Sequence, residues 1–232
     1  ATIDAAVQAK AVKPAEFERA IVDTTAQEKA IAHPVDSRLL EIARSKIVQA
    51  AKRSGINLKQ SYAKEGKELR RKAGGYAHAK QFRRMRKTVK RQRTILGIVL
   101  REIKRKLATA ELECSVSLQH LNTLLERAQR IHKQQPKDKN KLYALHAPEV
   151  ECIGKGKARK PYEFGVKVSI AITHKNGLMI GAKTFPGNPY DGHILHKQLT
   201  QTQILLENAG ATPKQVIVDL GFRGVDADNP DV

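Results

Sequence analysis

Hydrophobic positions recur at helical spacing through the middle of the chain. One helix is predicted to run to Gly55 from Asp36 or Ser37, either of which can cap it. A basic segment over 62–73 is expected to end at Gly74-Gly75, before a long helix. A further helix is predicted over 112–131. The inward positions of these helices are Leu40, Ala43, Ile47, Ala51, Leu96, Val99, Leu100, Ile103, Leu107, Val116, Leu121, Leu124, Leu125 and Ala128.

Towards both ends the repeat changes to that of β-strands. A short apolar run, 17–22, ends at Asp23, and residues 162–173 and 178–185 form a hairpin around Asn176-Gly177. A short buried strand, 215–218, ends at Asp219. Between them, Asp191 is expected to cap a helix ended by Gly210. The inward positions expected for that helix are Ile194, Leu195, Leu199, Ile204, Leu205 and Leu206.

Charge is distributed very unevenly. The formal net charge is +20, and residues 64–106 contain 17 basic and 3 acidic residues. Such a balance predicts a polyanionic partner. No apolar run approaches the roughly 18 residues that span a bilayer, which disfavours a membrane. Cys114 and Cys152 form no C-x-x-C pair, so neither a zinc ribbon nor a disulfide framework is indicated, and a reducing cytosolic compartment is the simplest interpretation.

The basic segment favours duplex DNA as this partner. Like charges four residues apart repel along a helix, and phosphates supply the missing counter-charge. Aromatic residues make up 4% of the chain and Trp is absent, which argues against base stacking on single strands. The residues predicted to contact DNA are Lys80, Arg83, Arg84, Arg86, Lys87, Lys90, Arg91 and Arg93.

Two aspartates follow short apolar strands in the same way. Asp23 and Asp219 lie 196 residues apart, and they converge if their strands are neighbours. Two adjacent carboxylates need a cation, and a pair of Mg²⁺ ions would suit phosphoryl transfer on DNA. For each aspartate by itself, the default interpretation is a turn former or a helix cap.

Longer motifs make the chain similar to a known family. They are IVDTTAQEKAIAHPVDSRLL from Ile21, AGGYAHAKQFRRMRKTVKRQR from Ala73, LYALHAPEVECIGKGKARKPYEFGVKVSIA from Leu142, GNPYDGH from Gly187 and VDLGFRG from Val218. On these motifs the chain resembles bacterial insertion-sequence transposases of the DDE type. The resemblance implies catalytic, metal-binding roles for Asp23 in the first motif and Asp219 in the last.

The resemblance also implies a fold class and domain boundaries. The expectation is an α/β protein whose RNase H-like mixed sheet is interrupted by a large basic, all-helical insertion between the first and second strands. Residues 1–35 would contain the first strand, 36–140 the DNA-contacting insertion, and 141–232 the rest of the core. The family's third carboxylate is a downstream Glu, but no Glu follows Asp219, and both ends resemble cuts. A truncated, catalytically impaired core is therefore expected.

The function implied is metal-dependent cleavage and strand transfer of an insertion sequence. Its cofactor would be Mg²⁺ or Mn²⁺, with two ions in the complete site. Its partner would be double-stranded DNA, bound by a homodimer or higher multimer in the bacterial cytoplasm at the nucleoid, without a membrane. Two alternatives stay open: an RNase H-like nuclease, and a non-enzymatic basic nucleic-acid-binding protein.

Overall fold

The computed structural model describes residues 2–109, 116–156 and 158–223. Within these ranges it contains six α-helices and one mixed sheet of five strands, which confirms the predicted mixture of helix and strand. The chain divides into two compact units, Ala1–Lys29 with Glu151–Val232, and Ala30–Val150. We call them the sheet unit and the helical unit. None of the described helices is long and apolar enough to cross a membrane.

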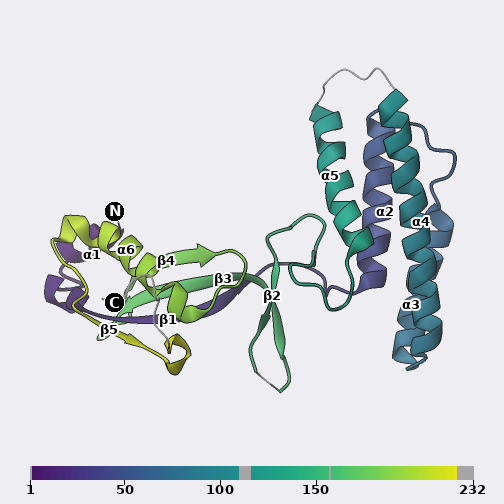
Figure 1. Ribbon diagram of the computed structural model, residues 1–232. Coiled ribbons are helices and arrows are strands. Elements are labelled where there is room, and N and C mark those ends of the chain that lie inside the picture. Colours follow the sequence, from purple (N-terminus) through teal and green to yellow (C-terminus); the bar gives the residue numbers. More distant parts are fainter. Residues whose placement is uncertain (1, 110–115, 157, 224–232) are drawn as a thin grey trace. The chain divides into compact units, whose positions relative to one another are not determined.

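The sheet is organised around its first and third strands. Along one edge of β3, β1 pairs antiparallel, while β2 and β4 pair antiparallel along the other edge. The last strand, β5, runs parallel to β1 on its free side (Figure 1). The bounds are β1 Arg19–Glu28, β2 Glu151–Gly154, β3 Tyr162–Thr173, β4 Met179–Phe185 and β5 Gln215–Val218.

One face of this sheet packs against helix α6, Leu195–Leu206. The core there includes Phe17, Val22 and Leu206, which are almost fully buried. Unexpectedly, α6 also buries polar side chains. Gln198 and Thr202 are inaccessible and share a hydrogen bond of 3.2 Å. The sheet unit is completed by α1, Thr2–Gln8, and by short 3-10 turns.

Three details of the sheet unit correct the sequence predictions. β1 does not end at Asp23 but continues to Glu28, because its backbone pairs with β3 as far as Gly165. β5 is not buried: Ile217 is 42% exposed, because the described part of this strand pairs with β1 alone. Ile204 and Leu205 are 65% and 43% exposed because they lie on the side of α6 that faces away from the sheet.

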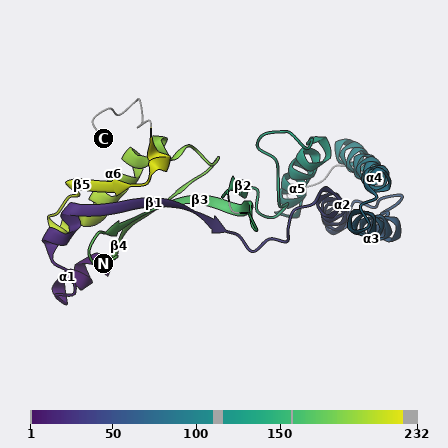
Figure 2. The same cartoon turned by 90° about the horizontal axis from the view of Figure 1, so that it is seen from below.

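The helical unit packs four helices around one apolar core. Figure 2 looks along the axes of these helices, which lie side by side. The predicted stripes of α2, α4 and α5 are buried as expected, with Leu40, Ile103 and Leu121 among the residues of lowest exposure. The helices are α2 Asp36–Arg53, α3 Ala63–His78, α4 Phe82–Thr109 and α5 Val116–Lys133.

Here too the boundaries differ in places. Gly74-Gly75 does not end α3, which continues to His78 because Ala73 is buried in the contact with neighbouring helices. Neither predicted capping side chain acts at α2, whose N-cap is Val35. Val116 is 83% exposed, since it lies at the very start of α5. Leu112 lies outside the described residues.

A buried ion pair connects α2 with the segment before α3. Arg44 makes two hydrogen bonds to Glu41, of 2.8 and 2.7 Å, and a third of 2.6 Å to the carbonyl of Ser61. Both charged side chains are less than 10% exposed. Gly66 of α3 lies directly over the pair, because a Cβ there would lie 2.2 Å from a carboxylate oxygen of Glu41.

Candidate active site and nucleic-acid interface

Asp23 and Asp219 come directly after the last residues that pair between the parallel strands β1 and β5. That pair is Val22 with Val218, so each aspartate is one residue beyond it. Neighbouring strands lie about 4.8 Å apart, which places the backbone at the two aspartates close together. Both residues are exposed. The pairing of their strands, which the two sequence patterns required, is therefore present.

Local hydrogen bonds orient both carboxylates. Asp219 Oδ1 accepts from the backbone N–H of Gly221 at 2.8 Å and caps the 3-10 turn Leu220–Phe222. Phe222, which is 3% exposed, anchors this turn in the core. On β1, Asp23 Oδ1 accepts from the backbone N–H of Thr24 at 2.7 Å. Each aspartate therefore has one oxygen in a local bond.

A third carboxylate, Asp191, lies near Asp219. A Cβ placed on Gly221 would lie 2.8 Å from Asp219 Oδ1 and 3.4 Å from Asp191 Oδ2. These two oxygens are therefore no farther apart than the sum of those distances, 6.2 Å. Sequence reasoning interpreted Asp191 as a helix cap. It does open a 3-10 turn, Asp191–His193, although no side-chain cap bond is made there.

Lys167 of β3 fixes the position of Asp191. Its ammonium lies 2.6 Å from Asp191 Oδ1 and donates a hydrogen bond of 2.6 Å to the carbonyl of Pro189. Lys167 is 9% exposed, an unusual degree of burial for a lysine. A buried lysine requires a carboxylate partner, but the sequence pattern of β3 indicates neither that Lys167 is buried nor which carboxylate it pairs with.

A cleft of about 430 Å³ adjoins Asp191. It contains two cationic side chains and one carboxylate, and several backbone and hydroxyl groups line the rest. A polar cleft of this composition suits an anionic or phosphate-bearing ligand beside the carboxylates. The lining residues are Thr24, Thr25, Ile153, Gly154, Lys155, Lys167, Asn188, Pro189, Tyr190 and Asp191.

The carboxylates are suitable ligands for Mg²⁺, a hard cation that prefers oxygen. Mg²⁺ is commonly bound by one or two protein carboxylates together with substrate phosphates, and Asp23 and Asp219 are two carboxylates next to the last registered pair of neighbouring strands. Among the described residues there is no group of three or more His, Cys, Asp or Glu side chains that could hold a metal ion by itself. The donor set thus fits a divalent ion shared with a phosphate-bearing ligand.

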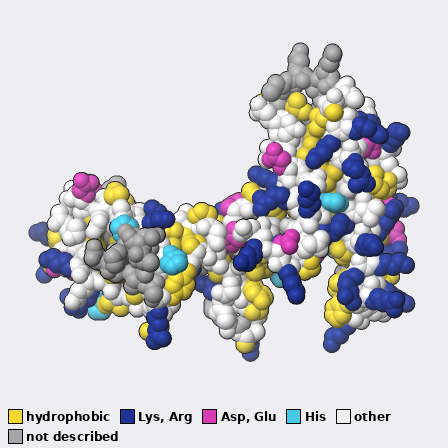
Figure 3. Space-filling model, viewed as in Figure 1, with side chains coloured by type: hydrophobic (Ala, Val, Ile, Leu, Met, Phe, Trp, Pro, Cys, Tyr) yellow, Lys and Arg dark blue, Asp and Glu magenta, His cyan; other side chains and the backbone are white. Residues whose placement is uncertain are grey.

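The predicted DNA-contacting residues lie in the helical unit, at the start of α4 and in the turn before it. Seven of the eight are exposed, and Figure 3 shows Lys and Arg side chains spread over this unit. Lys80 lies in the turn between α3 and α4 with a φ of 54°. Arg83, Lys87 and Lys90 make no ion pair within the described ranges. These four positions are available to external phosphates.

The remaining residues of the set have contacts within the protein. Arg91 pairs with Glu65 at 2.7 Å, and Arg84 donates a hydrogen bond to the side chain of Gln81. Arg86 donates only a weak hydrogen bond of 3.4 Å to a backbone carbonyl of its own helix. Arg93 is half-buried and donates to the backbone carbonyls of His132 and Gln134. Arg93 therefore connects α4 with the end of α5, a role that the charge pattern did not predict.

The fold and the site define a mixed α/β protein that combines carboxylates at paired strands with a strongly basic helical unit. Residues 126–227 match the family model described as the transposase DDE domain. This match confirms the predicted resemblance to DDE-type insertion-sequence transposases. The matched range contains Asp191 and Asp219, whereas Asp23 lies before it.

One curated relative is similar over a shorter stretch. It is described as an uncharacterized protein, ORF8 in the nfe locus of Rhizobium meliloti, and is 49% identical over 82 residues. The match covers 35% of this chain and 40% of the relative, so it spans well under half of either protein. No solved structure matches the chain.

Proposed function

We propose that this chain is part of a DNA transposase that cleaves phosphodiester bonds and transfers strands, with Asp23 and Asp219 as its metal-binding carboxylates. The observation that carries the proposal is the register of β1 and β5, which brings two distant aspartates to neighbouring positions. The family match supports the reaction class. Strand order supports an RNase H-like sheet, with the helical unit inserted between β1 and β2.

Each part of the site has a distinct role in this proposal. A bound Mg²⁺ or Mn²⁺ supplies Lewis acidity and lowers the pKa of water. Asp23 and Asp219 provide the oxygen ligands, and the bond from Gly221 orients Asp219. Asp191, whose Oδ1 pairs with Lys167, presents its other oxygen, Oδ2, on the side of Asp219. The basic helical unit binds duplex DNA, and its affinity should fall steeply as salt increases.

The proposal is tested by metal and DNA binding in Asp23→Asn and Asp219→Asn variants. Binding is a more direct readout of the two carboxylates than strand transfer, because it requires no other part of the reaction. Asn keeps an oxygen that can accept from Gly221 but removes the negative charge, which separates metal binding from folding. We expect Mn²⁺ affinity, followed by electron paramagnetic resonance, to fall by about tenfold or more, given the strength of charge-assisted contacts.

Asp138→Asn is the matched control, because Asp138 also accepts from a backbone N–H, that of Gln135 at 2.7 Å. It should leave Mn²⁺ affinity unchanged. DNA affinity without metal should be equal or slightly higher in the two site variants, since a negative charge has been removed. Unchanged Mn²⁺ affinity in both site variants would instead favour a non-enzymatic DNA-binding protein.

A further inference from the structure

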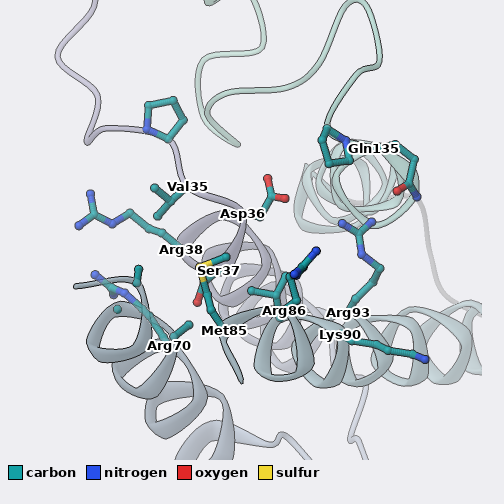
Figure 4. A pocket seen from close by; sticks show the side chains of 16 residues that line it. Val35, Asp36, Ser37, Arg38, Arg70, Met85, Arg86, Lys90, Arg93 and Gln135 are labelled. Carbon is teal, nitrogen blue, oxygen red and sulfur yellow. The ribbon is translucent and has the colours of Figure 1, made fainter. Parts of the chain in front are cut away.

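The helical unit contains a pocket of about 780 Å³ that the proposed active site does not use. It lies between the start of α2, the second half of α3 and the first half of α4, and Gln135 and Pro136 also line it (Figure 4). Its volume is within the range of small-molecule sites, and far larger than a single inorganic anion requires. The pocket therefore suits an anionic group attached to a larger ligand.

Its charge is strongly positive. Five cationic side chains line it, against one carboxylate, Asp36. None of the five forms an ion pair within the described part of the chain. In Figure 4, Arg86 extends from α4 towards Asp36 and Arg93 extends towards Gln135, whereas Lys90 points away from the pocket. The cationic residues are Arg38, Arg70, Arg86, Lys90 and Arg93.

The walls of the pocket are mainly apolar. Val35 is 48% exposed, and Met85 and Val89 are partly exposed beside it. An apolar wall next to arginines is unsuitable for a hydrated free ion but suits the carbon atoms of a sugar. Ser37, which is 9% exposed and also lines the pocket, has a hydroxyl with no hydrogen-bond partner among the described residues. That oxygen has almost no accessible surface, so the polar contacts that the pocket offers to a ligand come from its cationic side chains.

We propose that this pocket binds one phosphodiester group of the DNA backbone, with the adjoining deoxyribose against Val35 and Val89. Arg86 is the main phosphate ligand, because it has only the long bond to Phe82 and can present two N–H groups to one phosphate. Arg93 already donates to two carbonyls and contributes mainly charge. The inference rests on the proposed function in taking DNA as the ligand.

A pair of arginines on the same helix tests the proposal. Arg86 lines the pocket, whereas Arg83 is an exposed arginine one turn earlier that does not. We expect Arg86→Ala to weaken binding of a short fluorescein-labelled duplex by about tenfold, and Arg83→Ala by about threefold or less, because only the first loses a bidentate contact. Asp36→Asn should strengthen binding about twofold by removing the one opposing charge. Fluorescence anisotropy measures all three.

Two results would overturn the proposal. Equal losses from Arg86→Ala and Arg83→Ala would mean that DNA responds to a diffuse basic surface. The second result comes from an NMR titration with the duplex or with inorganic phosphate, in which the side-chain N–H signal of Arg86 is followed. If inorganic phosphate moves this signal and the duplex does not, the pocket is a small-anion site. Because Mn²⁺ binding is measured without DNA, neither result affects the test of Asp23 and Asp219.

Discussion

Replacing Lys167 with Met is expected to destabilise the sheet unit and to release Asp191 from its position near Asp219. The lysine ammonium is within 2.6 Å of both Asp191 Oδ1 and the carbonyl of Pro189. Met has similar length and fills the same space, so the variant removes the charge and the hydrogen-bond donor without leaving a large cavity. What remains is a carboxylate without its cation and a carbonyl without its donor.

The exposure of the two side chains determines the magnitude. Breaking a fully buried pair by removing one partner costs about 3–5 kcal/mol, whereas an exposed pair contributes about 0–1 kcal/mol. The side chains of Lys167 and Asp191 are 11% and 24% exposed, so they are closer to the buried limit, with some screening at Asp191. We therefore expect a loss of about 2–3 kcal/mol in the free energy of unfolding.

Urea denaturation with hydrogen exchange measures this loss separately for the sheet unit and the helical unit. Protection of the β3 amides should decrease, while that of α2 and α4 should not change. Lys175→Met is the control, since Lys175 is exposed in the turn after β3, and its effect should be below about 0.5 kcal/mol. A loss for Lys167→Met as small as that of the control would refute the idea that this pair fixes Asp191.

Three further outcomes are expected. Gly165→Ala should lower the free energy of unfolding by about 1–3 kcal/mol or more, because its Cβ would lie 2.1 Å from a backbone oxygen of β1. Gly154→Ala is the control, since its Cβ would meet nothing within 4 Å. Urea denaturation compares the two variants. Desolvation, and to a smaller extent the nearby arginines, lower the pKa of His132 below its ordinary value of 6.5. The neutral imidazole therefore contributes stability that is complete above pH 6.5 and is lost as the pH falls below that value. His132→Gln should remove this part of the pH dependence of thermal unfolding. Arg44→Met should cost about 3–5 kcal/mol in urea, and the double variant with Glu41→Leu should recover most of that loss, because it leaves no unpaired buried charge.

The sequence predicted the helical unit more accurately than the sheet. The repeats of α2, α4 and α5 identified residues such as Ile47 and Leu100 that are fully or almost fully buried. Helical periodicity records burial directly, since every third or fourth residue faces the core. Gly74-Gly75 was wrongly predicted to end α3. A glycine weakens a helix by only about 1 kcal/mol, and tertiary packing offsets that loss.

In the sheet unit, the buried face was the one that looked polar. The apolar face of β3 consists of Val166, Val168, Ile170 and Ile172, and all of these except Val168 are only half-buried. On the other face, Ser169 and Thr173 are inaccessible. The helix α6 covers that second face with polar side chains packed over small residues. Alternation alone cannot indicate which face a helix will cover.

The candidate site was likewise predicted in part. Apolar strands followed by aspartate identified Asp23 and Asp219, and the pairing of β1 with β5 agrees with that pattern. Asp191 was missed because its partner, Lys167, lies on β3, far along the chain from the 3-10 turn that Asp191 opens, and no local pattern reports such a pair. The pocket around Arg86 was missed for a similar reason, since three helices and a loop contribute to it.

Paramagnetic broadening by Mn²⁺ tests the central claim most directly. In an NMR titration of the whole chain, broadening should be strongest at the amides next to Asp23 on β1 and from Val218 to Gly221. Asp219→Asn should abolish it there, whereas Asp138→Asn should not. Broadening that is absent from these amides, or that persists unchanged in Asp219→Asn, would contradict a metal site where Asp23 of β1 lies beside Asp219 at the end of β5.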